Sequence, residues 1–210
     1  MAKIDLDTIK RLRELTGVGI TDAKQALVES DGDFDKALAA MRKKGMTKAE
    51  KRGEREARSG VIGSYIHDNR IGVLVEVNCE TDFVARNEIF TDLVKDIAMH
   101  IAASSPEFVS SEDIPADIKK AAEKEFTDKV KAEGKPEKMV PQIVDGMLKK
   151  HFAERCLLDQ PFIKNPDITV GQYVKEGIAK LGENIVVRRF NRMALGEIGQ
   201  LIIYNKNGLI

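Results

Sequence analysis

The change from a strand to a helix falls within residues 71–87, which read Ile-Gly-Val-Leu-Val-Glu-Val-Asn-Cys-Glu-Thr-Asp-Phe-Val-Ala-Arg-Asn. Residues 71–77 are mostly apolar, are rich in β-branched side chains and have the length of a largely buried strand. Beyond Asn87, apolar residues recur at the spacing of one helix face: Phe90, Leu93, Val94, Ile97 and Ile101. The sequence therefore predicts a buried strand that leads into a long amphipathic helix.

Two helix starts are possible between this strand and this helix. Thr81 or Asp82 could cap a first short turn, and Asn87 could cap a new helix. A restart at Asn87 leaves Phe83 on a protruding turn. An unbroken helix from Asp82 instead places Phe83 seven residues before Phe90, on the same buried face. Spacing alone favours the unbroken helix, because a large aromatic side chain usually belongs to the core.

The composition is that of an ordinary globular protein of one or two domains. The chain has 210 residues, of which 42% are hydrophobic and 32% charged, and Lys plus Arg equals Asp plus Glu at 34 each. This balance predicts no direct nucleic-acid partner and favours a protein partner or a small ligand. No run reaches the roughly 18 to 20 apolar residues of a membrane helix, and the acidic N-terminal stretch is unlike a signal peptide. We therefore expect a cytoplasmic protein that is not bound to a membrane.

The motifs of common enzymes and cofactor sites are absent from the sequence. Cys79 and Cys156 are far apart and have no second Cys or His at ligand spacing, which predicts reduced, partly buried thiols. We find no phosphate-binding glycine loop, no metalloprotease motif and no nucleophile elbow. The sequence thus predicts no catalytic residues, no cofactor, no metal site and no enzyme activity.

Residues 1–45 are predicted to form a three-helix module. Gly17-Val18-Gly19 ends the first helix, Thr21 caps the second, Asp33 caps the third, and Gly45 ends the third. So short a bundle buries little apolar surface and is marginal on its own, so we interpret it as a docking module. Residues 46–59 follow with alternating charge and almost no large apolar side chain, which predicts a solvated linker that is helical at least in part.

The remaining segments complete an α+β fold. Two strand-like runs around Asp68-Asn69 predict a β-hairpin with His67 at its tip, and residues 184–193 predict a further strand of a small antiparallel sheet. Ser104-Ser105-Pro106 ends the long helix, and two amphipathic helices over residues 115–155 are predicted to form an antiparallel helical hairpin. Residues 197–210 form a tail to which the sequence assigns no role.

Three parts of the chain resemble the elongation factor Ts family, the guanine-nucleotide exchange factors of bacterial elongation factor Tu. Residues 81–87, Thr-Asp-Phe-Val-Ala-Arg-Asn, are similar to its signature. Residues 9–27 resemble its N-terminal domain, which is like ubiquitin-associated three-helix modules. The Gln-Pro-Phe turn at residues 160–162, with the helix after it, resembles its second signature. The resemblance runs from about residue 9 to residue 196.

The resemblance implies a mechanism and a set of site residues. A member of this family binds elongation factor Tu with GDP, promotes GDP release by displacing Mg²⁺ and so allows GTP to load. By this resemblance the residues that dislocate the metal are Thr81, Asp82, Phe83 and Val84. Secondary partner contacts are expected at Val18, Ile20 and His67, although Ile20 could equally close the helical bundle.

The resemblance also bears on assembly and on the division into domains. Short members of the family form homodimers, so we expect a homodimer here. Residues 60–196 are then a core domain for dimerisation and exchange, and residues 1–45 a ubiquitin-associated-like module. Composition and periodicity alone fit a different function equally well, that of a passive scaffold that binds peptides or RNA without acting on a nucleotide.

Overall fold

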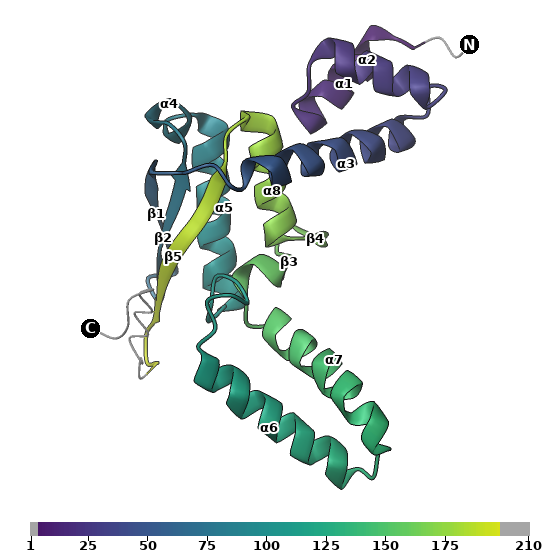
Figure 1. The fold of residues 1–210 in the computed structure, drawn as a ribbon. Helices are drawn as coiled ribbons and strands as arrows, with labels where there is room; N and C mark the ends of the chain where they lie inside the picture. Colours follow the sequence, from purple (N-terminus) through teal and green to yellow (C-terminus); the bar gives the residue numbers. More distant parts are fainter. Residues whose placement is uncertain (1–3, 198–210) are drawn as a thin grey trace.

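A computed structural model of the chain describes residues 4–197 (Figure 1). The predicted tail begins at residue 197, and residues 198–210 lie outside the described residues. The helices and strands are α1 (Leu6–Thr16), α2 (Ile20–Glu29), α3 (Phe34–Arg52), β1 (Ser59–His67), β2 (Ile71–Cys79), α4 (Asp82–Ala85), α5 (Glu88–Ser104), α6 (Ala116–Ala132), α7 (Val140–Ala153), β3 (Pro161–Phe162), β4 (Asn165–Thr169), α8 (Val170–Leu181) and β5 (Ile185–Ala194).

The centre of the molecule is a three-stranded antiparallel sheet in the order β1-β2-β5. Asp68 and Asn69 both adopt positive φ angles, of 48° and 54°, and the Arg70 N–H donates to the carbonyl of His67 at 2.9 Å. This is the tight turn that matches the right-handed twist of two antiparallel strands. The predicted hairpin, the third strand and the α+β fold class are confirmed.

Helices α5 and α8 cover one face of this sheet (Figure 1). The helix face predicted from residue spacing is buried there: Phe90, Leu93, Val94, Ile97 and Ile101. It packs on the alternate residues of β2 that point to the same side, Val73, Val75, Val77 and Cys79. Among the described residues 4–197, no helix lies on the other face of the sheet (Figure 1). The main core therefore lies between one face of the sheet and the two helices.

The helical module at the N-terminus has an apolar core of its own. Asp33 caps α3 by accepting from the Lys36 N–H at 3.0 Å, and Gly17 ends α1 in the left-handed conformation, as predicted. The predicted cap at Thr21 is wrong. Helix α2 begins two residues earlier than this cap implies, at Ile20 after Gly19, and its start has no side-chain cap. Gly19 takes the cap position in an extended conformation, with φ of −66° and ψ of 155°.

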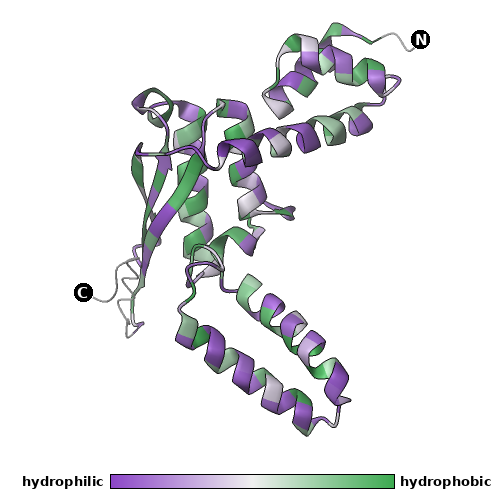
Figure 2. Cartoon of the chain, in the orientation of Figure 1, coloured by the Kyte–Doolittle hydropathy of each residue, from purple (hydrophilic) through white to green (hydrophobic). Residues whose placement is uncertain are grey.

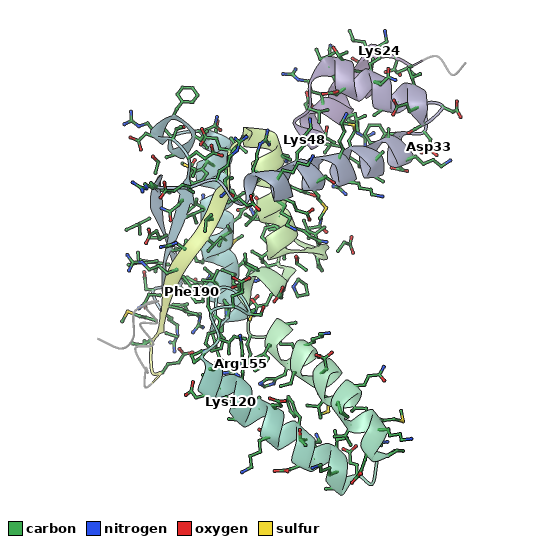
Figure 3. All side chains as sticks on the ribbon, in the orientation of Figure 1. Lys24, Asp33, Lys48, Lys120, Arg155 and Phe190 are labelled. Atoms are coloured by element: carbon green, nitrogen blue, oxygen red, sulfur yellow. The ribbon has the colours of Figure 1, made fainter. Side chains whose placement is uncertain are left out.

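The predicted end of the third helix at Gly45 is also wrong. Helix α3 continues through Gly45 to Arg52, so the first half of the predicted linker is helix. A Cβ atom at Gly45 would lie 3.2 Å from the Cβ of Ala179 on α8. The glycine therefore permits a close approach of two helices instead of ending one. Figure 1 shows α3 running from the module to α8, and Lys48 marks this part of α3 in Figure 3.

Helices α6 and α7 form the predicted helical hairpin, which projects away from the sheet (Figure 1). Polar and apolar residues alternate along both helices (Figure 2), and the apolar ones form two small clusters between them. At the base of the hairpin Arg155, labelled in Figure 3, forms an ion pair with Glu107. No helix within residues 4–197 is long and apolar enough to cross a bilayer.

Candidate functional site

The turn between β2 and α5 contains a separate four-residue helix, α4. Thr81 caps it, since its side-chain oxygen accepts from the Val84 N–H at 3.4 Å. Asn87 then caps α5 by accepting from the Ile89 N–H at 2.9 Å. The helix therefore restarts at Asn87. The reading that spacing favoured, an unbroken helix with Phe83 in the core, is wrong.

Phe83 is the most exposed large apolar side chain among residues 4–197, with 84% of its surface accessible. Val84 and Ala85, the next two residues, are buried against the main core. Asp82, Arg86 and Asn87 surround Phe83 and line with it an open hollow of about 520 Å³. One turn of helix thus holds an aromatic ring in solvent while its other side is anchored in the interior.

Two carboxylates connect this turn to the turn between α8 and β5. Glu183 accepts through Oε2 from the backbone N–H groups of Glu80 and Thr81, at 3.1 and 3.0 Å, and through Oε1 from the Thr81 hydroxyl at 2.7 Å. In return, Glu80 accepts from the Asn184 N–H at 2.6 Å. We call this reciprocal pair the carboxylate clasp. Sequence reasoning missed it because Thr81 and Glu183 are 102 residues apart and belong to no common motif.

A second polar cluster lies at the other end of α5, and it is buried. His100 is fully buried; its Nδ1 accepts from the Ile163 N–H at 3.2 Å, so Nε2 carries the proton and donates to Gln160 Oε1 at 2.9 Å. Burial lowers the pKa of His100, and the hydrogen bond with Gln160 partly opposes this. Beside it, the Phe162 ring stacks on Tyr173 with centroids 4.3 Å apart. His100, Gln160 and Phe162 of this cluster are buried, so these side chains serve packing inside the chain.

Comparison with known proteins identifies the family. The model of the family described as elongation factor TS matches residues 20–177. Curated relatives named elongation factor Ts include one from Desulfosudis oleivorans, 48% identical over 94% of this chain and the whole relative. Others come from Geobacter sulfurreducens, 50% identical, and Heliobacterium modesticaldum, 52% identical, each covering 90% of this chain and 88% of the relative. The chain belongs to the elongation factor Ts family.

Membership in the elongation factor Ts family settles the type of activity. Elongation factor Ts is the guanine-nucleotide exchange factor of elongation factor Tu in translation, and it catalyses no chemical reaction of its own. The nucleotide and its metal ion are therefore held by the partner. Within residues 4–197 of this chain, no three His, Cys, Asp or Glu side chains are placed to hold a metal ion.

The structure of this elongation factor Ts chain separates the predicted secondary contacts from α4. His67 is exposed at the tip of the β1–β2 hairpin, whereas α4 follows the opposite end of β2, about 25 Å away along the strand. Ile20 is 51% exposed and does not close the helical bundle, while Val18 packs partly against the module core. These residues do not form one continuous site with Phe83.

The two cysteines of this chain are buried, and Cys79 lies just before the α4 turn, where its thiol donates to the Thr81 carbonyl at 3.2 Å. Both thiols are free, and both residues are fully buried, more completely than the sequence suggested. Burial raises the pKa of Cys156 to about 11 and also raises the pKa of Cys79. The thiols are therefore protonated, and both side chains pack in the core.

Proposed function

We propose that α4 is the element through which this chain drives nucleotide exchange, with Phe83 entering a cleft of elongation factor Tu near its bound Mg²⁺. The observation that carries this proposal is the 84% exposure of Phe83 on a turn anchored by buried Val84 and Ala85. Burying a Phe side chain yields about 1.5–3 kcal/mol. Aromatic side chains that are exposed before binding are typical hot spots of protein interfaces. We therefore assign Phe83 as the principal contact.

The remaining residues of the turn have supporting roles in this proposal. Thr81 caps the turn, Val84 packs behind it, and Asp82 is exposed beside Phe83. Mg²⁺ requires a nearly ideal octahedral arrangement of ligands, so a small shift of the elements that order the metal weakens its binding. Without the metal, the negative charge of the GDP phosphates is less well neutralised and GDP leaves faster.

Thermodynamic linkage adds a condition to this mechanism. If the chain lowers the affinity of elongation factor Tu for GDP, GDP lowers the affinity of elongation factor Tu for the chain by the same factor. The complex without nucleotide is therefore the tightest state, and loading of GTP releases the exchange factor.

The test is the rate at which elongation factor Tu releases a fluorescent GDP analogue when this chain is added. Phe83→Ala should lower the stimulated rate by about 10-fold or more, because a hot-spot contact is removed. Ile163→Ala is the control, since it removes a 45% exposed apolar side chain from the loop between β3 and β4, beside His100 and far from α4 along α5. An unchanged rate with Phe83→Ala removes Phe83 from the mechanism, and an unchanged rate with the wild-type chain favours the passive scaffold.

Secondary contacts are proposed at Val18, Ile20 and His67. The exposure of Ile20 and of His67 supports this proposal.

We further propose that residues 1–45 act as a ubiquitin-associated-like docking module, residues 46–59 as a linker and residues 60–196 as the core domain. The separate apolar core of the module supports this division. We propose the cytoplasm as the location and no direct binding of nucleic acid or membrane, which agrees with the balanced charge.

We propose that two copies of the chain associate through the face of the sheet that α5 and α8 leave uncovered. Four large apolar side chains on this face are 55% to 69% exposed: Ile62, Ile66, Leu74 and Met193. The register places Ile66 and Met193 on either side of Gly72, and Leu74 next to Ser64, so the four side chains share one surface. Exposed apolar surface of this kind on a sheet is usually covered by association.

Light scattering after gel filtration tests the dimer. The wild-type chain should have twice the chain mass of 23.3 kDa. Leu74→Lys places a charge in the middle of the apolar surface and should give a monomer that is still folded. A wild-type chain that elutes as a monomer at micromolar concentration contradicts the proposal.

A further inference from the structure

We propose that Glu183 is a positioning residue for nucleotide exchange: its carboxylate holds the turn that presents Phe83 to elongation factor Tu. The proposal rests on the function proposed for Phe83 and extends it to a residue on a different turn. Glu183 itself is not assigned a contact with the partner.

Helix α4 needs support from outside because it is too short to be stable alone. It has four residues, Asp82–Ala85, whereas isolated helices are marginal below about 12 residues. Phe83 gives it no packing energy, since the ring lies in solvent. Val84 and Ala85 anchor only the side of the turn that faces the core. The entry into the turn, at Glu80 and Thr81, must be held by other contacts.

Glu183 supplies three of these contacts, and the Cys79 thiol adds one by donating to the Thr81 carbonyl at 3.2 Å. One carboxylate accepts three hydrogen bonds at the entry to α4, two from backbone N–H groups and one from the Thr81 hydroxyl, all at 2.7 to 3.1 Å. Hydrogen bonds to an ionised acceptor are stronger than those between neutral groups. The same Thr81 oxygen caps the Val84 N–H. Glu183 therefore sets the rotamer of the residue that caps the helix.

The position of Glu183 is itself fixed by its neighbours. Gly182 ends α8 in the left-handed conformation, with φ of 80°, and turns the chain toward α4. Asn184 is buried; its backbone N–H donates to Glu80, and its side chain donates to the carbonyls of Gly53 and Arg55, at 3.3 and 2.7 Å. The carboxylate clasp thus joins the turn before α4 to the turn after α8, and the Asn184 side chain ties that second turn to the segment after α3.

A fixed turn matters for exchange because the ring must reach one particular place. A turn that moves before binding must be ordered on binding, at a cost in affinity or rate. A displacement of about 1 Å at a reacting site can lower a rate by about 100-fold. We expect Glu183→Ala to bind elongation factor Tu through the other contacts, but to accelerate GDP release less within the complex.

The experiment measures GDP release from elongation factor Tu over a range of concentrations of the exchange factor. Glu183→Ala should lower the maximal rate about 10-fold and change the half-saturating concentration less. A loss of folded protein alone has the opposite effect, since it raises the half-saturating concentration and leaves the maximal rate unchanged. Glu183→Gln keeps an acceptor oxygen at the same distance and should recover most of the rate.

Two variants act as controls for this measurement. Glu183→Asp keeps the charge but is one methylene shorter, so its maximal rate should be low, like that of the alanine variant. It replaces Glu183→Ala in the test if the alanine variant does not fold. Glu50→Ala removes a carboxylate that also accepts a hydrogen bond from a distant side chain, Lys175 at 3.1 Å, but does not touch the turn. Its maximal rate should equal that of the wild type.

The double variant with Phe83→Ala separates the possible outcomes. If Glu183 acts through Phe83, Glu183→Ala causes no further loss once Phe83 is alanine. A further loss of the same size in that background, or a normal maximal rate with Glu183→Ala and Glu183→Asp alone, overturns the role of Glu183 and leaves that of Phe83. A normal maximal rate with Phe83→Ala alone overturns the proposed function, and the positioning role with it.

Discussion

Two phenylalanines at opposite ends of α5 have opposite environments. Phe83 precedes the start of the helix on α4 and is 84% exposed, whereas Phe162 lies beside His100 near the other end and is 3% exposed. Both occur in stretches that resemble signatures of the family. The contrast shows that two such stretches can place the same residue type in solvent at one end and in the interior at the other.

The difference between the two ends comes from what surrounds each ring. The Phe162 ring stacks on Tyr173 of α8, and the Tyr173 hydroxyl donates to Asp96 of α5 at 3.0 Å. Phe162 is therefore packed against side chains of the surrounding helices. The Phe83 ring instead stands in solvent beside the open hollow that it lines with Asp82, Arg86 and Asn87. We therefore expect variants near Phe162 to change stability and variants near Phe83 to change exchange, and the predictions below test this separation.

The largest effect on stability is expected at Phe162. Phe162→Ala removes a buried aromatic side chain and leaves a cavity, which typically costs about 3–5 kcal/mol in the free energy of unfolding. Urea unfolding followed by circular dichroism measures this, and Phe162→Leu should cost less because it fills more of the space. A loss below about 1 kcal/mol with alanine would show that the interior at this end of α5 is loosely packed.

A second effect at the same end depends on pH. Burial holds the pKa of His100 below its ordinary value of 6.5, so the unfolded chain binds a proton more readily than the folded chain. Above pH 6.5, His100 should not change the free energy of unfolding. As the pH falls below 6.5, the free energy of unfolding should decrease by up to about 1.4 kcal/mol per pH unit, until the folded protein also binds the proton. His100→Gln should remove this part of the pH dependence. An identical pH profile in the variant contradicts the prediction.

Two threonine caps allow a smaller and more direct comparison. Thr169 caps α8 and exchanges hydrogen bonds with Gln172, at 2.9 and 3.1 Å, while Thr81 caps α4. Thr169→Ala should cost about 1 kcal/mol of stability and leave the maximal exchange rate unchanged. Thr81→Ala should lower the exchange rate more than the stability. The separation fails if both variants change only stability.

The smallest effect on stability is expected for Phe83→Ala. The ring is in solvent, so the free energy of unfolding should stay within about 0.5 kcal/mol of the wild type in the same urea titration. Phe83→Leu serves as a matched variant that keeps an apolar side chain at the turn. A loss of about 3 kcal/mol or more, the size expected for a core Phe, would mean that the ring is buried in solution, as it would be in an unbroken helix.

Local signals in the sequence predicted the elements well. The cap at Asp33, the Asp68-Asn69 turn and the helix end at Ser104 each depend on residues within about four positions, and all three are present in the structure. The two-stranded sheet of β3 and β4 was missed because its strands are too short to show a pattern. Gly45 was misread because a glycine that ends a helix and one that permits close packing look the same in sequence.

The sequence by itself therefore determined the elements, the α+β class and the resemblance to elongation factor Ts, because turns, caps and periodicity act over a few neighbouring residues. Only the tertiary structure decided that Phe83 is exposed, since burial depends on which distant segments cover a side chain. It also placed Glu183 against Thr81, across 102 residues of sequence. Contacts of this kind arise from the path of the whole chain, and no local pattern records them.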